Sequence, residues 1–273
     1  MTDLDPALTA QIEKAAVLVE ALPYLQEFRH QLIVVKLGGS AMENDELVAQ
    51  VMRDLVLLEA VRIKPIVVHG GGKFISAAME KAGLEPKFVG GMRYTGENSI
   101  RIVDETLNGE INPSLVQKAG GHGGNAIGIR GQDVFIAEKM MGTDDDGQPA
   151  DLGHVGKVTN CNLDTVNEAI EADKIPIVSP LAANSAGGDF PLNVNADLAA
   201  SALARRLKAT KLVYLSDVLG VMGDPKDSST LISTIDQTKA DQLIADKVIQ
   251  GGMIPKIRSS LDALNDGVGK VHM

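Results

Sequence analysis

Two glycine-rich loops carry the residue types best suited to chemistry. Lys36, Gly38 and Gly39 lie in the segment KLGGS after one apolar run, and His69 opens the segment HGGGK after another. Glycine lets the backbone approach a ligand closely, and free N–H groups at the start of a helix bind anions. A pair of such loops could hold phosphoryl oxygens between two strand ends. Taken alone, each loop is also explained as a tight turn between a strand and a helix.

Common nucleotide-binding motifs do not describe these loops. Gly72 and Lys73 are followed by Phe74 rather than by Ser or Thr, which excludes a P-loop of the Walker A type. Residues 121–126 match the loose dinucleotide pattern G-x-G-x-x-A, but they follow a predicted helix and precede a predicted strand. Because that order is the reverse of the one in dinucleotide-binding folds, we interpret this segment as a helix-to-strand turn.

Three further charged residues lie in or after turns. Arg93, in the segment GGMRYT, could clamp a carboxylate with both guanidinium nitrogens. Asp197 precedes an Ala-rich helix, and Lys256 follows a second glycine turn. The simplest interpretations are a surface arginine, a helix-capping or first-turn acid, and a solvated helix lysine.

The sequence predicts no metal site made by the chain itself. His30, His122, His154 and His272 lack ligand spacing. The acids at 144–146 resemble a hairpin tip without the spacing of an EF-hand. Cys161 is the only cysteine, which excludes an intrachain disulfide and a cysteine-based zinc site and fits a reduced, cytoplasmic compartment.

Apolar, β-branched runs alternate with helical patterns along the chain. Strands are predicted at residues 32–36, 65–69, 126–130, 133–138, 176–180, 211–216 and 270–272. Helices are predicted at residues 46–62, 74–82, 98–119, 163–172, 197–207, 240–248 and 256–264. Strands that are apolar on both faces and separated by helices indicate an α/β fold with a mainly parallel central sheet. Ligands of such sheets bind beyond the carboxyl ends of the strands, where the glycine loops lie.

Composition narrows the class of protein further. The chain has 273 residues, of which 44% are hydrophobic, enough for one large domain or two lobes. Its net charge of −10 argues against a nucleic-acid partner. The apolar runs are far shorter than the roughly 18 residues of a membrane span. Residues 182–189, rich in Gly, Asn and Asp, predict either a lobe junction or a hairpin.

The first 30 residues predict a helix rather than a targeting signal, because they contain five acids. Pro23 is expected to end or kink this helix. The apolar stripe fits either packing on its own domain or an oligomerisation arm on a neighbouring subunit. The residues of the stripe are Leu8, Ile12, Ala15, Ala16, Val19 and Leu22.

Seven segments, in order, resemble the amino acid kinase family, and within it the acetylglutamate kinases. They are residues 36–40, 69–72, 91–95, 151–156, 192–197, 215–220 and 251–256. Each segment alone is weak, but the ordered set is specific and runs from about residue 32 to the C-terminus. The segments NVNAD and GMRYT favour acetylglutamate over the substrates of the aspartate, carbamate, UMP and glutamate 5-kinases.

The resemblance implies an αβα three-layer sandwich with two lobes. It divides the chain into an N-terminal helical extension at 1–30, an N-acetylglutamate-binding lobe at 31–192 and an ATP-binding lobe at 193–273. The implied reaction is the ATP-dependent phosphorylation of the side-chain carboxylate of N-acetyl-L-glutamate to N-acetylglutamyl 5-phosphate, the second step of arginine biosynthesis. Mg²⁺ would accompany ATP and be held largely by its phosphates.

The resemblance also implies roles for individual residues. Lys36 and Lys256 match the lysines that stabilise the transferring phosphoryl group, and Asp197 matches the carboxylate that orients both. The phosphate-binding residues are Gly38 and Gly39, and the substrate-binding residues are Gly71, Gly72, Arg93 and Asn193. The segments of the nucleotide site contain Ser216, Asp217, Gly251, Gly252 and Met253.

This chemistry needs no general base. A side-chain carboxylate with a pKa near ~4.3 is already ionised at pH 7. The difficulty is to bring this anion to the phosphate tail of ATP, which lysines, glycine amides and helix N-termini overcome by positioning and charge stabilisation.

Both chain ends bear on regulation. Residues 21–29 resemble the N-terminal helix of the arginine-inhibited, hexameric acetylglutamate kinases, which favours the oligomerisation arm, a homo-oligomer (dimer or hexamer) and arginine as feedback inhibitor. After Met273, relatives continue through a further strand and helix that supply part of the arginine site, so the C-terminus is expected to be shortened.

Three alternatives stay open. The chain could be a related kinase acting on an aminoadipate derivative, or a non-catalytic sensor of the same fold that binds arginine or a partner. The presence of Lys36, Asp197 and Lys256 together argues against the sensor. A NAD-linked enzyme rests only on the misplaced glycine pattern.

Overall fold

A parallel sheet of six strands forms the centre of the computed structural model, which describes residues 5–144, 146–215, 219–224 and 226–273. The strand order is β12-β11-β1-β2-β8-β5, and every pairing in this sheet is parallel. The strands are β1 (Leu32–Leu37), β2 (Lys64–His69), β5 (Ala126–Ile129), β8 (Ile175–Val178), β11 (Lys211–Leu215) and β12 (Lys270–His272). The mainly parallel central sheet is therefore confirmed.

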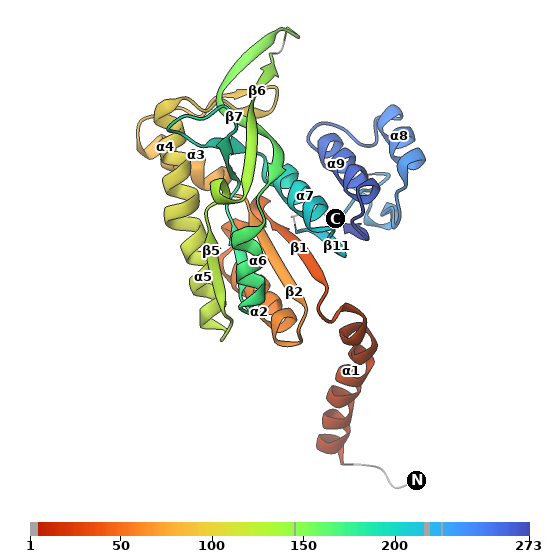
Figure 1. The fold of residues 1–273 in the computed structure, drawn as a ribbon. Coiled ribbons are helices and arrows are strands. Elements are labelled where there is room, and N and C mark those ends of the chain that lie inside the picture. The colour runs from red at the N-terminus through yellow and green to blue at the C-terminus, as the bar shows by residue number, and fades with distance from the viewer. Residues whose placement is uncertain (1–4, 145, 216–218, 225) are drawn as a thin grey trace.

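Helices cover both faces of this sheet, which makes the fold a three-layer αβα sandwich (Figure 1). One face carries α2 (Asp45–Ala60), α3 (Gly72–Lys81), α4 (Glu97–Asp104) and α5 (Asn112–Gly121). The other face carries α6 (Asp164–Glu171), α7 (Ala196–Leu207) and α9 (Met253–Asn265), and α8 (Gln237–Ala245) packs beside α9. Within the described residues, no helix is both long and apolar enough to cross a bilayer.

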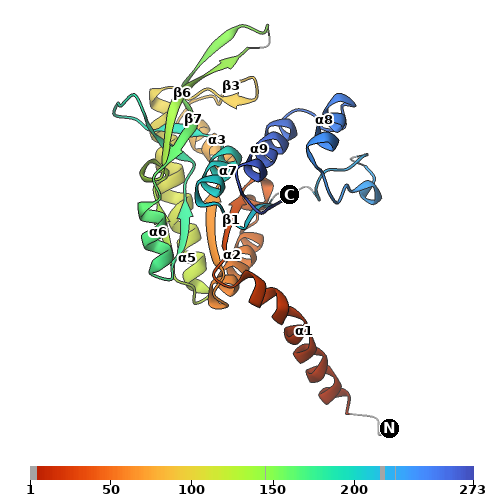
Figure 2. The same ribbon diagram turned by 45° about the vertical axis from the view of Figure 1, so that its right-hand side comes forward.

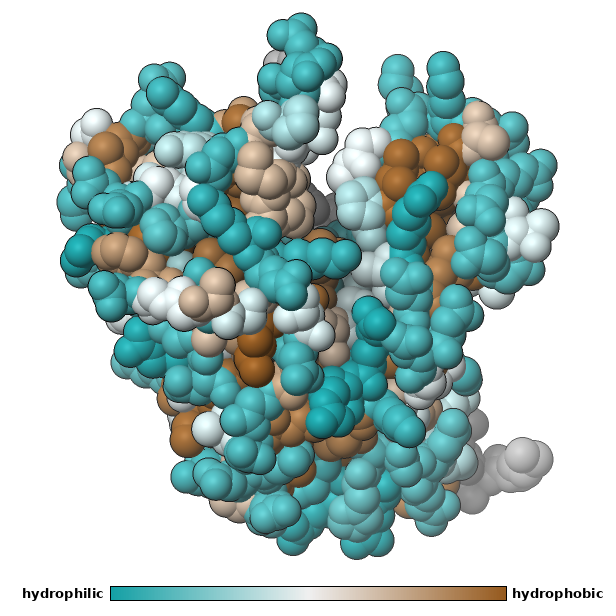
Figure 3. All heavy atoms as spheres, turned by 45° about the horizontal axis from the view of Figure 1, so that its top comes forward, coloured by the Kyte–Doolittle hydropathy of each residue, from teal (hydrophilic) through white to brown (hydrophobic). Residues whose placement is uncertain are grey.

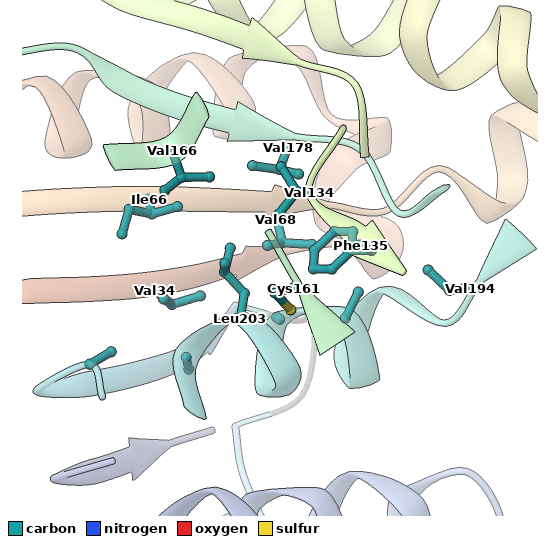
Figure 4. Packing of buried hydrophobic residues seen from close by; sticks show 14 of the residues in the cluster. Val34, Ile66, Val68, Val134, Phe135, Cys161, Val166, Val178, Val194 and Leu203 are labelled. Atoms are coloured by element: carbon teal, nitrogen blue, oxygen red, sulfur yellow. The ribbon is translucent and has the colours of Figure 1, made fainter. Parts of the chain in front are cut away.

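Alternating strand residues supply two separate cores. Val34 and Val68 point to the side of α6 and α7, where they pack with Leu203 (Figure 4). Val35 points to the opposite side and packs in the core that contains Met52 of α2. Because helices bury both faces of each strand, the central strands have continuous apolar sequences.

A second, closed sheet of four strands was largely missed by the sequence analysis. It consists of β6 (Phe135–Thr143), β7 (Pro149–Cys161), β9 (Leu181–Asn184) and β10 (Leu192–Val194), and only β6 was predicted. The long β6–β7 hairpin projects from the body (Figures 1 and 2), so many of its residues are polar and exposed. Its tip lies at the acids predicted to form a hairpin turn, of which Asp145 is outside the described residues. A short hairpin of β3 (Phe88–Val89) and β4 (Met92–Arg93) lies nearby.

Two predictions about turns can now be decided. Strands β9 and β10 pair antiparallel, so residues 182–189 belong to a hairpin rather than to a lobe junction. Residues 121–126 connect the end of α5 to the start of β5, which confirms the helix-to-strand turn.

Two of the differences from the predicted helices have a local cause, in one case a π-helical segment and in the other a side-chain cap. The single helix predicted at 98–119 is three segments, because a π-helical stretch, Glu105–Ile111, separates α4 from α5. Such insertions widen a helix locally and are invisible to a 3.6-residue pattern. Helix α8 starts three residues before its predicted start, because the Asp236 side chain accepts a hydrogen bond from the Lys239 N–H and caps it.

The N-terminal helix α1 (Pro6–Phe28) extends away from the body (Figures 1 and 2). Pro23 was expected to end or kink this helix; the helix continues through it, so the end is wrong, and the kink stays a prediction. Ile12, Val19 and Leu22 of the stripe are exposed, so packing of the stripe on its own domain is also wrong. The C-terminal end of α1 contacts the body, where Lys211 Nζ lies 4.0 Å from the centre of the Phe28 ring and Phe28 packs on a core.

A third, small core lies in the C-terminal part of the chain. It contains Val221, Ala240, Leu243, Ile249, Ile257 and Leu261, and it is separate from the two cores that flank the sheet. Helix α7 and strand β11 instead belong to the main body.

Candidate active site

Lys36 lies near the carboxyl end of β1, one residue before the strand ends. The side chain of Lys36 projects to the same face of the sheet as Val34, the face that α7 covers. Lys36 is only 8% exposed. Its Nζ lies 2.8 Å from Oδ1 of Asp197, in the first turn of α7. Asn195 fixes this turn, because its side chain accepts hydrogen bonds from the N–H groups of Asp197 and Leu198. Asp197 is therefore a first-turn acid, and the cap is Asn195.

Lys256 reaches the same carboxylate from a different helix. It lies in the first turn of α9, and its Nζ is 3.5 Å from Oδ2 of Asp197. Apart from the Lys36 ion pair, Oδ1 of Asp197 has no hydrogen-bond partner within the described part of the chain. Two ammonium groups around one carboxylate leave a net positive charge, which attracts an anion.

The two glycine loops lie side by side next to Lys36. The N–H of Gly70 donates a hydrogen bond to the carbonyl of Leu37 at 2.7 Å, which joins the loops. A methyl group at Gly38 would overlap the Lys36 ammonium group, so the absence of a side chain there leaves room for this cation. Gly39 has a φ of +70°, in the left-handed region that glycine tolerates best.

Helix α3 begins directly after the second loop. Gly71 occupies its N-cap position, and no side chain caps this end. The first N–H groups of α3 have no partner within the helix and can bind an anion. A methyl group at Gly71 would collide with side chains of Ile111 and Leu107, whereas Gly72 faces open space.

Arg93 is held against the start of α3. Its Nη2 donates hydrogen bonds to the carbonyl of Gly72 at 2.8 Å and to Oγ of Ser76 at 2.7 Å. Its guanidinium carbon lies 4.8 Å from the centre of the Phe88 ring. Burial lowers the pKa of Arg93 from its usual value. These contacts fix the direction of the guanidinium group.

Lys36, Asp197 and Arg93 line one cavity of about 290 Å³, and Lys256 lies beside it, on the other oxygen of Asp197. The space-filling view shows this face of the molecule hollowed between two parts (Figure 3). The polar lining of the cavity includes Lys36, Gly39, Gly71, Gly72, Arg93, Asn193 and Asp197. Its apolar lining includes Ile75, Phe88, Leu107 and Met140. The combination suits a small anionic ligand that also has an apolar part.

Asn193 enters the cavity from β10. Its Nδ2 donates to Oγ1 of Thr95 at 3.4 Å. Strand β10 was not predicted as a strand, so the position of Asn193 could be anticipated only from its sequence segment.

Three of the residues predicted to bind nucleotide lie within the described part of the chain, and they are not part of this cavity. Gly251, Gly252 and Met253 lie at the start of α9, where no side chain caps the helix. Ser216 and Asp217 lie outside the described residues.

The buried ring of His69 contacts the backbone of the second glycine loop, a role that the sequence analysis missed. The side chain is completely buried, and burial lowers the pKa of His69 to about 4. Nδ1 lies 2.9 Å from the carbonyl of Gly70, and Asn112 Nδ2 lies 3.3 Å from Nε2. A neutral imidazole protonated on Nδ1 satisfies both contacts. Asn112 also donates to the carbonyl of Ile177 at 2.8 Å. No local signal links His69 to Asn112, because their contact depends on the fold.

Comparisons with known proteins agree with this geometry. The model of the amino acid kinase family matches residues 31–273. An acetylglutamate kinase of Akkermansia muciniphila is 52% identical over 269 residues, which cover 98% of this chain and 90% of that protein. One of Aquifex aeolicus is 42% identical, covering 96% of this chain and 90% of that protein. The solved structure of smu.665 from Streptococcus mutans superposes with a TM-score of 0.73 at 29% identity, covering 88% of this chain and 93% of the other.

Proposed function

The chain belongs to the amino acid kinase family, and on this premise we propose that it transfers the γ-phosphoryl group of ATP to the side-chain carboxylate of N-acetyl-L-glutamate. The product is N-acetylglutamyl 5-phosphate, an intermediate of arginine biosynthesis. One observation carries the proposal: Lys36 and Lys256 meet on Asp197 beside a cavity that suits a small carboxylate ligand.

The reaction is a direct displacement. The substrate carboxylate is ionised at neutral pH, because a glutamate side chain has a pKa of about 4.3. One of its oxygens attacks the γ-phosphorus, the bond to the β-phosphate oxygen breaks, and ADP leaves with the electron pair. No proton is transferred in this step, so no general base is needed.

Lys36 and Lys256 stabilise the charge on the transferring phosphoryl group. Asp197 orients both ammonium groups through its two oxygens. The N–H groups of Gly38 and Gly39 hold phosphoryl oxygens.

The substrate is held on the other side of the cavity. Gly71 and Gly72 place free helix N–H groups of α3 toward the reacting carboxylate. Arg93 and Asn193 bind the α-carboxylate and the neighbouring amide. The apolar lining formed by Phe88 and Met140 suits the acetyl methyl group.

The nucleotide is bound by residues of the C-terminal part. Gly251, Gly252 and Met253 contribute the start of α9, and Ser216 and Asp217 contribute the segment after β11. The expected division is a substrate lobe at 31–192 and an ATP lobe at 193–273. The separate core around α8 and α9 supports a distinct C-terminal part that begins after β11, because α7 and β11 share the main core.

A divalent metal accompanies ATP in this type of kinase, and we assign Mg²⁺. The donor set fits a metal held by phosphates: no group of three metal-ligating side chains occurs in the described ranges, and Asp197 is already engaged by two lysines. When bound, Mg²⁺ neutralises charge on the phosphates.

The exposed apolar residues of α1 support an oligomerisation arm, and with it a homo-oligomer, either a dimer or a hexamer. The resemblance of residues 21–29 supports arginine as the regulatory ligand of such an assembly. The single cysteine, which is buried and free, supports a reduced cytoplasmic location.

The alternatives are less well supported. The curated relatives at 40–52% identity are named acetylglutamate kinases, which does not favour an aminoadipate derivative as substrate. A non-catalytic sensor would not need Lys36 and Lys256 on one carboxylate.

The test is an assay that couples ADP release to a spectroscopic signal. Turnover is expected with N-acetyl-L-glutamate and not with L-glutamate, N-acetyl-L-aspartate or N-acetyl-α-aminoadipate. Preferential turnover of the aminoadipate derivative would assign a different substrate, and calorimetric binding of arginine without binding of ATP would support the sensor.

A further inference from the structure

We propose that Tyr214 is a positioning residue that holds the Lys256 ammonium group on Asp197. Tyr214 has no role in the chemistry described above. The inference rests on the proposed function, because it assigns a task within the same site.

Tyr214 lies directly beside the first catalytic lysine. Strands β1 and β11 are parallel, and Lys36 is the register partner of Tyr214. Partners in a parallel pair project to the same face of the sheet, so both side chains point toward α7. Tyr214 is only 3% exposed, so its ring is fixed by the surrounding core.

The two ends of the Tyr214 side chain contact the other two members of the site. The Nζ of Lys256 lies 5.7 Å from the centre of the ring, within the range of a cation–π interaction. The hydroxyl group donates to the backbone carbonyl of Asp197 at 3.4 Å. A single side chain therefore touches both residues of the Lys256–Asp197 ion pair.

The position of the Lys256 ammonium group depends on the contact with Tyr214 more than the position of the Lys36 ammonium group does. Its ion pair with Asp197 measures 3.5 Å, against 2.8 Å for Lys36. Within the described ranges, Asp197 is the only carboxylate that pairs with Lys256. An ammonium group held by one long contact has a poorly fixed position, and the face of the Tyr214 ring restricts it.

Three buried serines, Ser201, Ser259 and Ser260, lie between α7 and the helix that carries Lys256. Ser201 of α7 donates to the carbonyl of Ser259 in α9 at 2.9 Å. Ser259 and Ser260 donate to the carbonyl of Lys256 at 3.0 and 2.7 Å. Burial raises the pKa of Tyr214, while hydrogen bonding with these serines acts against that rise, so the phenol stays protonated at neutral pH.

Burial of the Tyr214 hydroxyl group is unfavourable unless the group is hydrogen-bonded. A buried hydroxyl group loses its hydration, and a hydrogen bond within the protein must offset the free energy of this desolvation. Leu212, two residues earlier on the same face of β11, packs in the same core without any polar atom. Packing alone therefore does not call for a tyrosine at 214, whereas a link between α7 and α9 does.

Two substitutions separate the ring from the hydroxyl. Tyr214→Phe keeps the ring and removes the hydroxyl, and kcat is expected to fall about fivefold, the effect of one lost hydrogen bond. Tyr214→Leu also removes the ring, and kcat is expected to fall about 30-fold. KM for N-acetyl-L-glutamate is expected to stay within about twofold, because Arg93 and Asn193 are untouched. Ser201→Ala removes the hydrogen bond from α7 to the carbonyl of Ser259 in α9, and kcat is expected to fall by a similar factor, because this bond also ties the Lys256 helix to α7.

Matched controls distinguish positioning from general weakening. Val166→Ala removes volume from the same core on α6, so it should lower the melting temperature and leave kcat unchanged. Tyr24→Phe makes the same chemical change at an exposed position on α1 and should leave both quantities unchanged.

A second readout does not depend on activity. With trace acetic anhydride, each amine reacts according to its accessibility and its free-base fraction, and mass spectrometry reports each lysine separately. Relative to exposed Lys14, the amine of Lys256 should react several-fold faster in Tyr214→Leu than in the unaltered protein, while Lys36 should react as before.

The outcomes are distinguishable. Unaltered protein without turnover of N-acetyl-L-glutamate would remove the proposed function, yet faster labelling of Lys256 would still support its positioning by Tyr214. Normal turnover in Tyr214→Phe and Tyr214→Leu, with unchanged labelling of Lys256, would overturn the inference. If Tyr214→Leu fails to fold, Tyr214→Phe and Ser201→Ala carry the same test.

Discussion

One carboxylate placed between two ammonium groups is the feature from which the chemistry follows. Asp197 pairs with Lys36 through one oxygen at 2.8 Å and with Lys256 through the other at 3.5 Å, so both ammonium groups gather at one carboxylate. Net positive charge remains, and it faces a cavity lined by free helix N–H groups. Such a site stabilises the extra negative charge of a transferring phosphoryl group without any proton transfer.

Loss of the Lys36 ammonium group should slow the chemical step and leave substrate binding largely intact. We expect Lys36→Met to lower kcat by about 10²- to 10³-fold, the effect of removing one preorganised charge contact. Steady-state kinetics would measure this, and an equal rise in KM with unchanged kcat would show that Lys36 only binds the ground state.

A methyl group at Gly38 should act through Lys36. Its position overlaps the ammonium group, which is the far end of a flexible side chain, so the ammonium is expected to move rather than the backbone. Gly38→Ala should therefore lower kcat about tenfold or more and change the melting temperature little. Gly120→Ala, in a helix with open space around it, is the matched control and should be neutral or slightly stabilising.

His69 should make stability depend on acid pH. Its folded-state pKa of about 4 is below the unfolded value of 6.5, so the unfolded chain takes up a proton first as pH falls. The stabilisation from neutral His69 is complete above pH 6.5 and is lost between about pH 6.5 and pH 4. Its full size is about 3 kcal/mol.

Denaturant unfolding at pH 7 and pH 5 would measure this effect. The difference in unfolding free energy between the two pH values should be larger for the unaltered protein than for His69→Gln, since other titrating groups cancel in the comparison. Equal pH dependence in the two proteins would contradict the assignment.

Residue roles could be predicted where a local segment carries them. Lys36, Arg93 and Asp197 each lie in a segment whose resemblance indicated a role before the fold was known. His69 and Tyr214 could not be assigned in this way, because their partners are distant in sequence and only the fold brings them together.

At the scale of elements, burial decided which predictions were correct. The central strands are covered on both faces, so their apolar runs identify them directly. Strands β7 and β10 were missed, because the β6–β7 hairpin is largely exposed and strand β10 has only 3 residues, too few for an alternating pattern. The π-helical segment was missed for a different reason, since its residues fit the pattern of a regular helix.

Helix α1 should control assembly and not chemistry. Its apolar residues are exposed and it contacts the body at its C-terminal end, so we expect it to bind another subunit. Deletion of residues 1–28 should reduce the mass measured by light scattering and keep kcat within about twofold, because the active-site cavity contains no residue of α1. An unchanged mass would show that oligomerisation, if it occurs, uses another surface.

At the scale of the molecule, one sheet brings the whole site together. Lys36 ends a central strand, Asp197 begins a helix on one face, and Lys256 begins another helix whose own core lies farther out. The chain carries a net charge of −10, yet it gathers cations at the carboxyl ends of its strands. The parallel sheet and this location were predictable from sequence. The distances around Asp197 were not, because they depend on how α7 and α9 pack.

Trapping of the acyl phosphate tests the central claim most directly. With ATP, N-acetyl-L-glutamate and hydroxylamine, the protein should form N-acetylglutamyl hydroxamate in a one-to-one ratio with ADP, and Asp197→Asn should lower both yields together. Release of ADP without hydroxamate, or full hydroxamate formation by Asp197→Asn, would contradict phosphoryl transfer to a carboxylate at this site.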